Sequence, residues 1–312
     1  MPETDSSEQN KLRRFRFSET AFFKEQDLDF INTLNKYGFS RVAVLDGAEC
    51  KLPFHRVILC FAGYEASHTD DDDSEAVIHP YYLISQASYR NALSFVRDMR
   101  IQGHSFDMND NIPIKWILDQ LPFLMTGKNT LAYIENLGSR FHVQILTTGI
   151  DIQITDHIKR KSSDNTCLHC NKCVDNCPTG AITSAGFIRD NCLRNWMLSG
   201  RIPPYDISVR MGNRLIGCDE CQECCPMNRK GSASIVSFKL KELLSDRENK
   251  QLSEMIGNNL AIKNRVIIQA CLIAESCKRK DLMPDLEQLL THPSATVRQA
   301  AENALNILKT SV

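Results

Sequence analysis

Cys167-Leu-His-Cys170-Asn-Lys-Cys173-Val-Asp-Asn-Cys177-Pro178 begins the stretch around which this chain is organised. The stretch closes with Cys218-Asp-Glu-Cys221-Gln-Glu-Cys224-Cys225-Pro226, so a second run also ends in Cys-Pro. One further cysteine, Cys192, lies between the two runs. Proline lacks a backbone N–H and fixes φ at about −65°, so each Cys-Pro pair shapes the turn that presents its sulfur.

The first run has the C-x-x-C-x-x-C-x-x-x-C-P spacing of bacterial two-cluster ferredoxins, and this spacing predicts two 4Fe–4S clusters. Three thiolates on one tight loop can reach three irons of a single cubane, while the fourth residue of the run ligates the other cluster. We therefore expect a crossed arrangement. Cluster one takes Cys167, Cys170, Cys173 and Cys225, and cluster two takes Cys177, Cys218, Cys221 and one more thiolate, for which Cys192 is the candidate.

Two positions in this assignment depend on comparison between the runs. Cys192 is the candidate because the second half lacks a full run of its own. Cys224 and Cys225 compete for cluster one, and we choose Cys225 because, like Cys177, it directly precedes proline. Zinc would account for C-x-x-C pairs but not for the third cysteine and the repeated Cys-Pro ending. Disulfides would require an oxidising compartment, and the sequence indicates no route to one, so they are not expected.

Composition is that of an ordinary globular protein with an excess of cysteine. The chain has 312 residues, a net charge of −1 and 13 cysteines, so no global electrostatic partner is implied. The cysteines outside the central stretch lie in apolar contexts and are expected to be buried: Cys50, Cys60, Cys271 and Cys277. The polar N-terminus lacks the features of a signal peptide and no apolar run would span a membrane, so we expect a cytoplasmic protein without a membrane partner.

Hydrophobic patterning predicts an α+β chain. Expected helices lie between Ser18 and Gly38 and at 80–100, 114–124, 190–199, 264–275, 282–290 and 294–308, and expected strands lie at 42–45, 57–61 and 143–147. Residues 105–113 are rich in turn formers. These elements suggest three domains: an α/β domain at 1–158, a ferredoxin-like two-cluster domain at 159–232 and a helical module at 233–312, whose helix pairs resemble HEAT units.

The central stretch and its flanks resemble the epoxyqueuosine reductases, which are cobalamin-dependent iron–sulfur enzymes of tRNA modification. The matching segments are Cys177-Pro-Thr-Gly-Ala-Ile182, Arg189-Asp-Asn-Cys192, Met211-Gly-Asn-Arg-Leu-Ile-Gly-Cys218-Asp-Glu-Cys221 and Cys225-Pro-Met-Asn228. The C-terminal pattern His292-Pro293, Val297-Arg298 and Ala301 is also similar to the family. The resemblance supports Cys192 as the remaining ligand, because the family places a cluster cysteine there.

The resemblance also implies the rest of the site. Gly127, Lys128, Asn129 and Thr130 look like the family segment that lies beside the corrinoid, so the first domain would bind cobalamin. Asp110, in Asp110-Asn-Ile-Pro113, looks like the proton-donating aspartate, although it could equally be an ordinary turn residue. The C-terminal helices would hold tRNA, with phosphate contacts from basic side chains at Lys263, Arg265, Lys278, Arg279, Lys280 and Arg298, or these charges could simply be solvated.

The expected activity is therefore reduction of an epoxide in a modified tRNA nucleoside. Electrons would come from an external donor of flavodoxin or ferredoxin type, through two 4Fe–4S clusters, to cobalamin. This chain departs from the family at 114–116 and 123–126, where corrinoid and substrate would bind. Three alternatives remain: a ferredoxin-type electron carrier, a corrinoid reductase acting on another substrate, and an RNA-binding protein with structural clusters.

Overall fold

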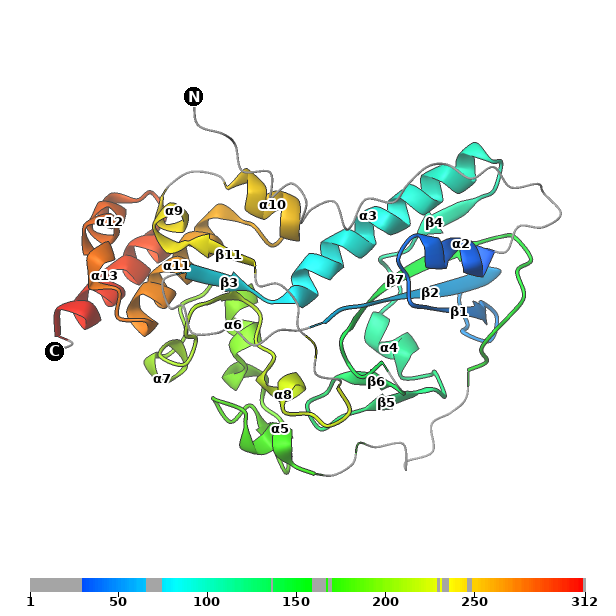
Figure 1. The fold of residues 1–312 in the computed structure, drawn as a ribbon, viewed down its shortest axis with the longest axis horizontal. Helices are drawn as coiled ribbons and strands as arrows, with labels where there is room; N and C mark the ends of the chain where they lie inside the picture. The colour runs from blue at the N-terminus through cyan, green and yellow to red at the C-terminus, as the bar shows by residue number, and fades with distance from the viewer. Residues whose placement is uncertain are drawn as a thin grey trace. The chain divides into compact units, whose positions relative to one another are not determined.

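The computed structural model describes residues 30–65, 75–135, 137–158, 167, 170–228, 231, 236–245 and 249–310 (Figure 1). The chain forms two compact units, and neither is a continuous stretch of sequence. Unit 1 comprises 1–62, 87–117 and 142–158, and unit 2 comprises 63–86, 118–141 and 159–312. The three domains expected at 1–158, 159–232 and 233–312 stay a prediction.

Unit 1 is built on a four-stranded sheet in the order β1-β2-β7-β4. Its strands are β1 (Arg41–Asp46), β2 (Arg56–Gly63), β4 (Phe106–Met108) and β7 (Phe141–Thr148). β1 and β2 form an antiparallel hairpin that pairs Arg41 with Phe61. All but the last residue of β2 are buried, as expected for a short run rich in β-branched side chains. The strands expected at 42–45, 57–61 and 143–147 are therefore confirmed.

Aromatic side chains fill the core between this sheet and two helices. The helices are α2 (Phe30–Lys36) and the part of α3 (Pro80–Ile101) that lies in unit 1. The rings of Phe95 and Phe106 meet edge to face at 5.1 Å, and Phe30 packs on Phe106 at 5.2 Å. Gly38 ends α2 with φ +87°, as expected, and Ser18 lies outside the described residues. The helix expected at 80–100 is confirmed as α3.

One expected helix is shorter than its pattern suggests. The helix expected at 114–124 ends after five residues as α4 (Ile114–Leu118). Pro122 explains the early end, because proline removes a helical N–H and disfavours the helical conformation in the residue before it. Leu124, the predicted last residue of this helix, instead begins a hairpin of β5 (Leu124–Thr126) and β6 (Ala132–Ile134). A short strand, β4, also lies within the expected turn-rich segment 105–113.

Unit 2 is centred on a small sheet whose middle strand comes from early in the chain. β3 (Glu75–Ile78) pairs in parallel with β10 (Arg214–Ile216) and antiparallel with β11 (Val236–Lys239). The region after 233 was expected to be entirely helical, and β11 corrects that expectation. The remaining elements around the cysteines are α5 (Lys172–Asp175), β8 (Ile182–Thr183), β9 (Gly186–Phe187), the 3-10 turn η1 (Arg189–Asn191), α6 (Leu193–Ser199), α7 (Tyr205–Ser208) and α8 (Glu220–Glu223).

The C-terminal helices pack into the same core as β3. They are α9 (Leu240–Leu244), α10 (Lys250–Ile256), α11 (Lys263–Ser276), η2 (Lys280–Leu282), α12 (Met283–Gln288), η3 (Leu289–Thr291) and α13 (Ala295–Thr310). The helices expected at 264–275 and 294–308 are confirmed as α11 and α13. The buried face of α13 is the one predicted from its spacing, with Val297, Ala301, Ala304, Leu305 and Leu308 inside. No helix in the described ranges has the length and apolar character that crossing a bilayer requires.

Candidate iron–sulfur site

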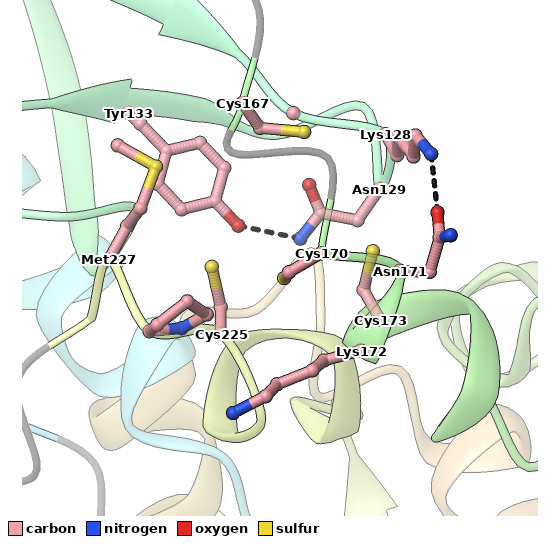
Figure 2. A pocket seen from close by; sticks show the side chains of 12 residues that line it. Lys128, Asn129, Tyr133, Cys167, Cys170, Asn171, Lys172, Cys173, Cys225 and Met227 are labelled. Carbon is pink, nitrogen blue, oxygen red and sulfur yellow. Dashed lines mark hydrogen bonds between the residues drawn. The ribbon is translucent and has the colours of Figure 1, made fainter.

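Four cysteines line one cavity in unit 2 (Figure 2). They are Cys167, Cys170, Cys173 and Cys225. Cys167 and Cys170 precede α5, Cys173 lies within α5, and Cys225 follows α8, so the two halves of the cysteine stretch meet here. The structure thus brings together the four residues expected around cluster one. Their ligation of iron stays a prediction.

A left-handed residue shapes the first cysteine loop. Asn171 has φ +61°, a conformation that asparagine tolerates better than most residues, and α5 begins directly after it. The Asn171 carbonyl accepts the N–H of Val174 at 2.8 Å, which closes the first turn. The Asn171 side chain accepts a hydrogen bond from Lys128, so the loop is also held from the β5–β6 hairpin. This reversal places Cys170 and Cys173 on the same cavity wall.

The second group of four cysteines also converges. The Cys221 thiol has a raised pKa, first because of burial and then because Cys218, Cys192 and Cys177 are its neighbours. Burial raises the pKa of Cys218 to about 12. Several thiolates this close together need a strong positive charge, and a bound metal supplies one because coordination deprotonates a thiol. The donor set therefore fits an iron–sulfur cluster, and ligation by these four residues stays a prediction.

Backbone N–H groups surround the sulfur of Cys177. The Ala181 N–H donates to this sulfur at 3.2 Å, and Gly180 adopts φ +63° within the intervening turn. Burial raises the pKa of Cys177, but N–H groups of Thr179, Ile182 and Ala181 outweigh burial and hold the pKa below its ordinary value. The segment Cys177-Pro-Thr-Gly-Ala-Ile182 thus forms a turn whose donors stabilise a thiolate.

Cys224 occupies a different place from its neighbour. Its pKa is raised to about 11 by burial and by nearby Cys173 and Cys225, so it lies close to the first group. Among the described residues that line the cavity, however, Cys225 is present and Cys224 is not. This geometry supports the choice of Cys225 over Cys224, which stays a prediction.

The Gly127–Thr130 segment lies against the first cavity and is largely occupied by internal contacts. Asn129 is buried and donates to the Tyr133 hydroxyl at 2.7 Å and to the Cys221 carbonyl at 3.3 Å. A Cβ on Gly127 would lie 2.7 Å from the Tyr133 ring, so only glycine fits there. Thr130 is exposed and has φ +62°. Lys128 and Asn129 therefore brace the cysteine loops, and contact of Gly127, Lys128, Asn129 and Thr130 with a corrinoid stays a prediction.

Two further sets of interacting side chains border the second set of cysteines, and no sequence pattern predicted either of them. Arg194, two residues after Cys192, donates to the Tyr82 hydroxyl at 2.9 Å and stacks over Tyr81 at 4.9 Å. The two tyrosines precede Arg194 by more than 100 residues, so the sequence pattern could not pair them.

The second group joins His79 to the residue after Cys218. His79 lies 3.3 Å from the Asp219 carboxylate. The pKa of Asp219 lies below its ordinary value, because burial, which raises it, is outweighed by the hydrogen bond and charge of His79.

Asp110 belongs to unit 1, in the loop between β4 and α4. Its side chain is exposed. The turn at this point is made by the neighbouring Asn109, whose side-chain oxygen accepts the N–H groups of Asn111 and Ile112, each at 3.1 Å. Asp110 therefore has no role in capping this turn, and its catalytic role stays a prediction.

No group of three or more His, Cys, Asp or Glu side chains in the described part of the chain is placed to hold a single metal ion. A 4Fe–4S cluster binds each of its four cysteines through a separate iron, so its ligands surround a cubane instead of converging on one point.

Comparison with known proteins agrees with the cysteine geometry. Residues 166–228 match the family described as a 4Fe-4S double cluster binding domain. Epoxyqueuosine reductase of Bacillus subtilis (strain 168) is 27% identical over 194 residues, 58% of this chain and 49% of that protein. Epoxyqueuosine reductase of Escherichia coli (strain K12) is 31% identical over 150 residues, 45% of this chain and 38% of that protein. Residues 166–228 thus match the double cluster family, and the chain is similar in sequence to the epoxyqueuosine reductases.

The chain spans about half the length of the Bacillus subtilis family member, and less of the Escherichia coli one. A crystal structure of epoxyqueuosine reductase with an epoxyqueuosine-modified tRNA-Tyr stem loop superimposes with a TM-score of 0.70 at 18% identity, covering 90% of this chain and 89% of that one. At this identity the likeness shows a shared fold, and it confirms the predicted α+β class. The expected resemblance to the epoxyqueuosine reductase family is likewise confirmed.

Proposed function

We propose that this protein is an iron–sulfur oxidoreductase that carries electrons through two 4Fe–4S clusters to a bound cobalamin and reduces an epoxide in modified tRNA. One observation carries the proposal: two groups of four cysteines converge in unit 2, within the residues that match a double cluster binding domain. Two clusters in one unit form a path for electrons. An enzyme with this path needs a terminal acceptor, which the relatives' name identifies as an epoxide on queuosine.

Cobalamin would be held against the Gly127–Thr130 segment. The support is position, since three of these residues line the cavity that contains the four cysteines of cluster one. Thr130 is the exposed member, so its hydroxyl and the adjacent backbone are the groups available to a large planar ligand. When bound, cobalamin would supply a metal centre that accepts electrons and attacks an electrophile.

Asp110 would donate the proton to the leaving epoxide oxygen. The side chain is exposed, so a bound substrate would have to cover it before it could act as a general acid at neutral pH. The departures from the family at 114–116 lie just after this residue and would border the substrate.

The C-terminal helices would contact tRNA through basic side chains. Several of the candidates expected from the sequence already bond to other groups of the protein. Arg279 is paired with Asp281 at 2.7 Å, and Arg298 donates to the His292 and Pro293 carbonyls. Arg265 donates to the Asn259 carbonyl. Lys278 is exposed and is the residue we favour for a phosphate contact. An external donor of flavodoxin or ferredoxin type and a cytoplasmic location stay predictions.

An electron carrier is the second candidate. It is favoured by the contacts of Lys128 and Asn129, which are made to the protein and not left open for a ligand. A corrinoid reductase that acts on another electrophile would use the same path for electrons.

The deciding experiment uses the full chain reconstituted anaerobically with iron, sulfide and cobalamin. Gel filtration followed by analysis for iron and cobalt tests whether the corrinoid is retained. Turnover is then assayed with epoxyqueuosine-containing tRNA and a chemical reductant. We expect queuosine to form, and Asp110→Asn to abolish its formation. Asp107→Asn, an exposed aspartate paired with Arg100 in the same unit, is the matched control and should remain active.

Retention of iron without cobalt would favour the carrier. Retention of both metals with no conversion would indicate another substrate. Queuosine formation that survives Asp110→Asn would remove that residue from the mechanism.

A further inference from the structure

The wall of the first cavity contains a tyrosine whose position is fixed by packing. Tyr133, on β6, is 2% exposed and lies beneath Gly127, where a Cβ would come within 2.7 Å of its ring. Its hydroxyl is directed into the space between Asn129 and the Cys225 sulfur (Figure 2). Tyr133 therefore presents a polar group to one cysteine of cluster one.

The orientation of Asn129 is determined by its partners. Its side-chain nitrogen lies 3.3 Å from the Cys221 carbonyl oxygen, which can only accept a hydrogen bond. Its side-chain oxygen accepts the Leu131 N–H at 3.3 Å. The same nitrogen therefore donates to the Tyr133 hydroxyl, at 2.7 Å. The tyrosine oxygen is the acceptor in that hydrogen bond.

The tyrosine proton must consequently go to another group. Ser139 is one neighbour of the hydroxyl, but its oxygen already accepts from Gln222 at 2.9 Å and from Asn228 at 3.1 Å. A hydroxyl oxygen has two acceptor sites, so Ser139 has none left. The other neighbour is the Cys225 side chain, whose sulfur lies near the hydroxyl in Figure 2. A Cys225 thiolate bound to a cluster would keep a lone pair on this side and could accept a hydrogen bond from the hydroxyl.

We propose that Tyr133, held by Asn129, donates a hydrogen bond to the Cys225 thiolate of cluster one and raises the reduction potential of that cluster. The inference rests on the cluster-one ligand set of the proposed function. Reduction adds negative charge to a cluster, and a donor to a ligand sulfur stabilises that charge. Asn129 also binds the main chain at Cys221, so the residue that orients this donor touches the ligand loop of cluster two.

The test is Tyr133→Phe in the reconstituted full chain, because phenylalanine keeps the ring and removes only the hydroxyl. Midpoint potentials of both clusters are measured by EPR-monitored redox titration. We expect the cluster-one potential to become more negative and the cluster-two potential to remain unchanged. Resonance Raman spectra in H₂O and D₂O give a second readout: an Fe–S(Cys) band that shifts on deuteration in the wild type should lose that part of its shift in the variant.

Tyr64→Phe is the matched control. The Tyr64 hydroxyl, in the same unit, donates to the Gln222 side chain at 3.4 Å and not to a cysteine. Its removal should leave both potentials unchanged. A fluorotyrosine introduced at position 133 keeps the hydroxyl as a stronger donor and should move the cluster-one potential in the positive direction, even if Tyr133→Phe does not fold.

Unchanged potentials and an unchanged deuterium shift in Tyr133→Phe, with full iron content, would overturn this inference and leave the proposed function intact. A wild-type chain that assembles no first cluster would instead overturn the ligand set, and iron analysis separates the two failures.

Discussion

Cys192 stands at the junction of η1 and α6, where one extended residue separates the two helical turns. Its backbone N–H donates to the Arg189 carbonyl, and its own carbonyl accepts from Asn195 at 3.0 Å. The backbone therefore fixes the direction of this side chain before any metal binds. Together with its electrostatic interaction with Cys221, this arrangement supports the prediction that Cys192 is the fourth ligand of cluster two.

Substitution of single cysteines tests that assignment. Cys192→Ala should lower the iron content from about eight to about four per chain and remove the EPR signal of one cluster, because each 4Fe–4S cluster requires four thiolates. Cys224→Ala is the matched control, adjacent to a ligand but outside the cavity lining, and should retain both clusters. Loss of iron in Cys224→Ala with retention in Cys192→Ala would reverse the assignment.

Ligand spacing on a tight loop is a local property, so the sequence could predict the three cysteines of the first run as one group, and ligation by either group of four stays a prediction. The sequence was not enough to find the groups around these cysteines. Tyr133 and Cys225 are far apart in the chain, as are Tyr82 and Arg194, and no periodicity links such pairs. The motif around Asn129 predicted contact with a cofactor. Its side-chain amide donates to two protein acceptors, the Tyr133 hydroxyl and the Cys221 carbonyl, which the motif did not indicate.

Helix α11 carries an acidic side chain into the core of unit 2. Glu275 is 4% exposed, and its carboxylate accepts the Ser208 hydroxyl of α7 at 2.8 Å. Burial raises the pKa of Glu275 above its ordinary value, and the single hydrogen bond from Ser208 only partly offsets that effect. Burial of the charge therefore costs the fold free energy when this carboxyl group is ionised, and that cost disappears when the group is protonated.

Stability should consequently fall as the pH rises through the pKa of Glu275 in the folded state. The raised pKa stabilises the fold fully below the ordinary glutamate pKa, and that contribution is lost at higher pH. Glu275→Gln stays neutral and keeps an oxygen for Ser208. Its free energy of unfolding relative to the wild type should therefore rise in denaturant titrations as the pH increases from below the ordinary glutamate pKa, at about pH 4, to about pH 8. Glu302→Gln, on the exposed side of α13, should show no such trend. A gain that is equal at all pH values would exclude the ionisation of Glu275 as its cause.

Elements with a long periodic pattern were predictable, and short ones were not. The buried face of α13 follows from its spacing, since one amphipathic helix needs no knowledge of its partners. The strands β3, β10 and β11 have only three or four residues each, and their pairing joins parts of the chain that no local signal connects. The helix predicted at 114–124 was too long for a local reason, because the effect of Pro122 outweighed the apolar pattern around it.

At the scale of the whole molecule, the cysteine-bearing unit depends on residues far upstream. β3 is the middle strand between β10 and β11, and Tyr82 belongs to the same hydrophobic core as α6 and α11. The β5–β6 hairpin, at 124–134, lines the first cavity through Tyr133. Unit 2 is therefore assembled from three separate stretches.

A fragment of residues 159–312 should fail to form a stable unit. Without β3, the backbone groups of β10 and β11 lose their pairing partner, and buried groups without partners destabilise a fold. We expect the fragment to lack a cooperative thermal transition by circular dichroism and to bind less iron than the full chain after the same reconstitution. A fragment that melts cooperatively with full iron would show that the cysteine stretch and the C-terminal helices fold without the upstream strands.

The central position of β3 also affects the order of events during synthesis on the ribosome. Residue 78 of β3 must wait for residue 236 of β11, 158 positions later, before the sheet can close. At the usual rate of translation this delay is roughly 8 to 30 s. All the predicted cluster ligands emerge within that interval, before the sheet of unit 2 can close. Iron–sulfur assembly factors would therefore meet a nascent chain whose thiols are accessible, and metal insertion would precede closure of the unit that encloses it.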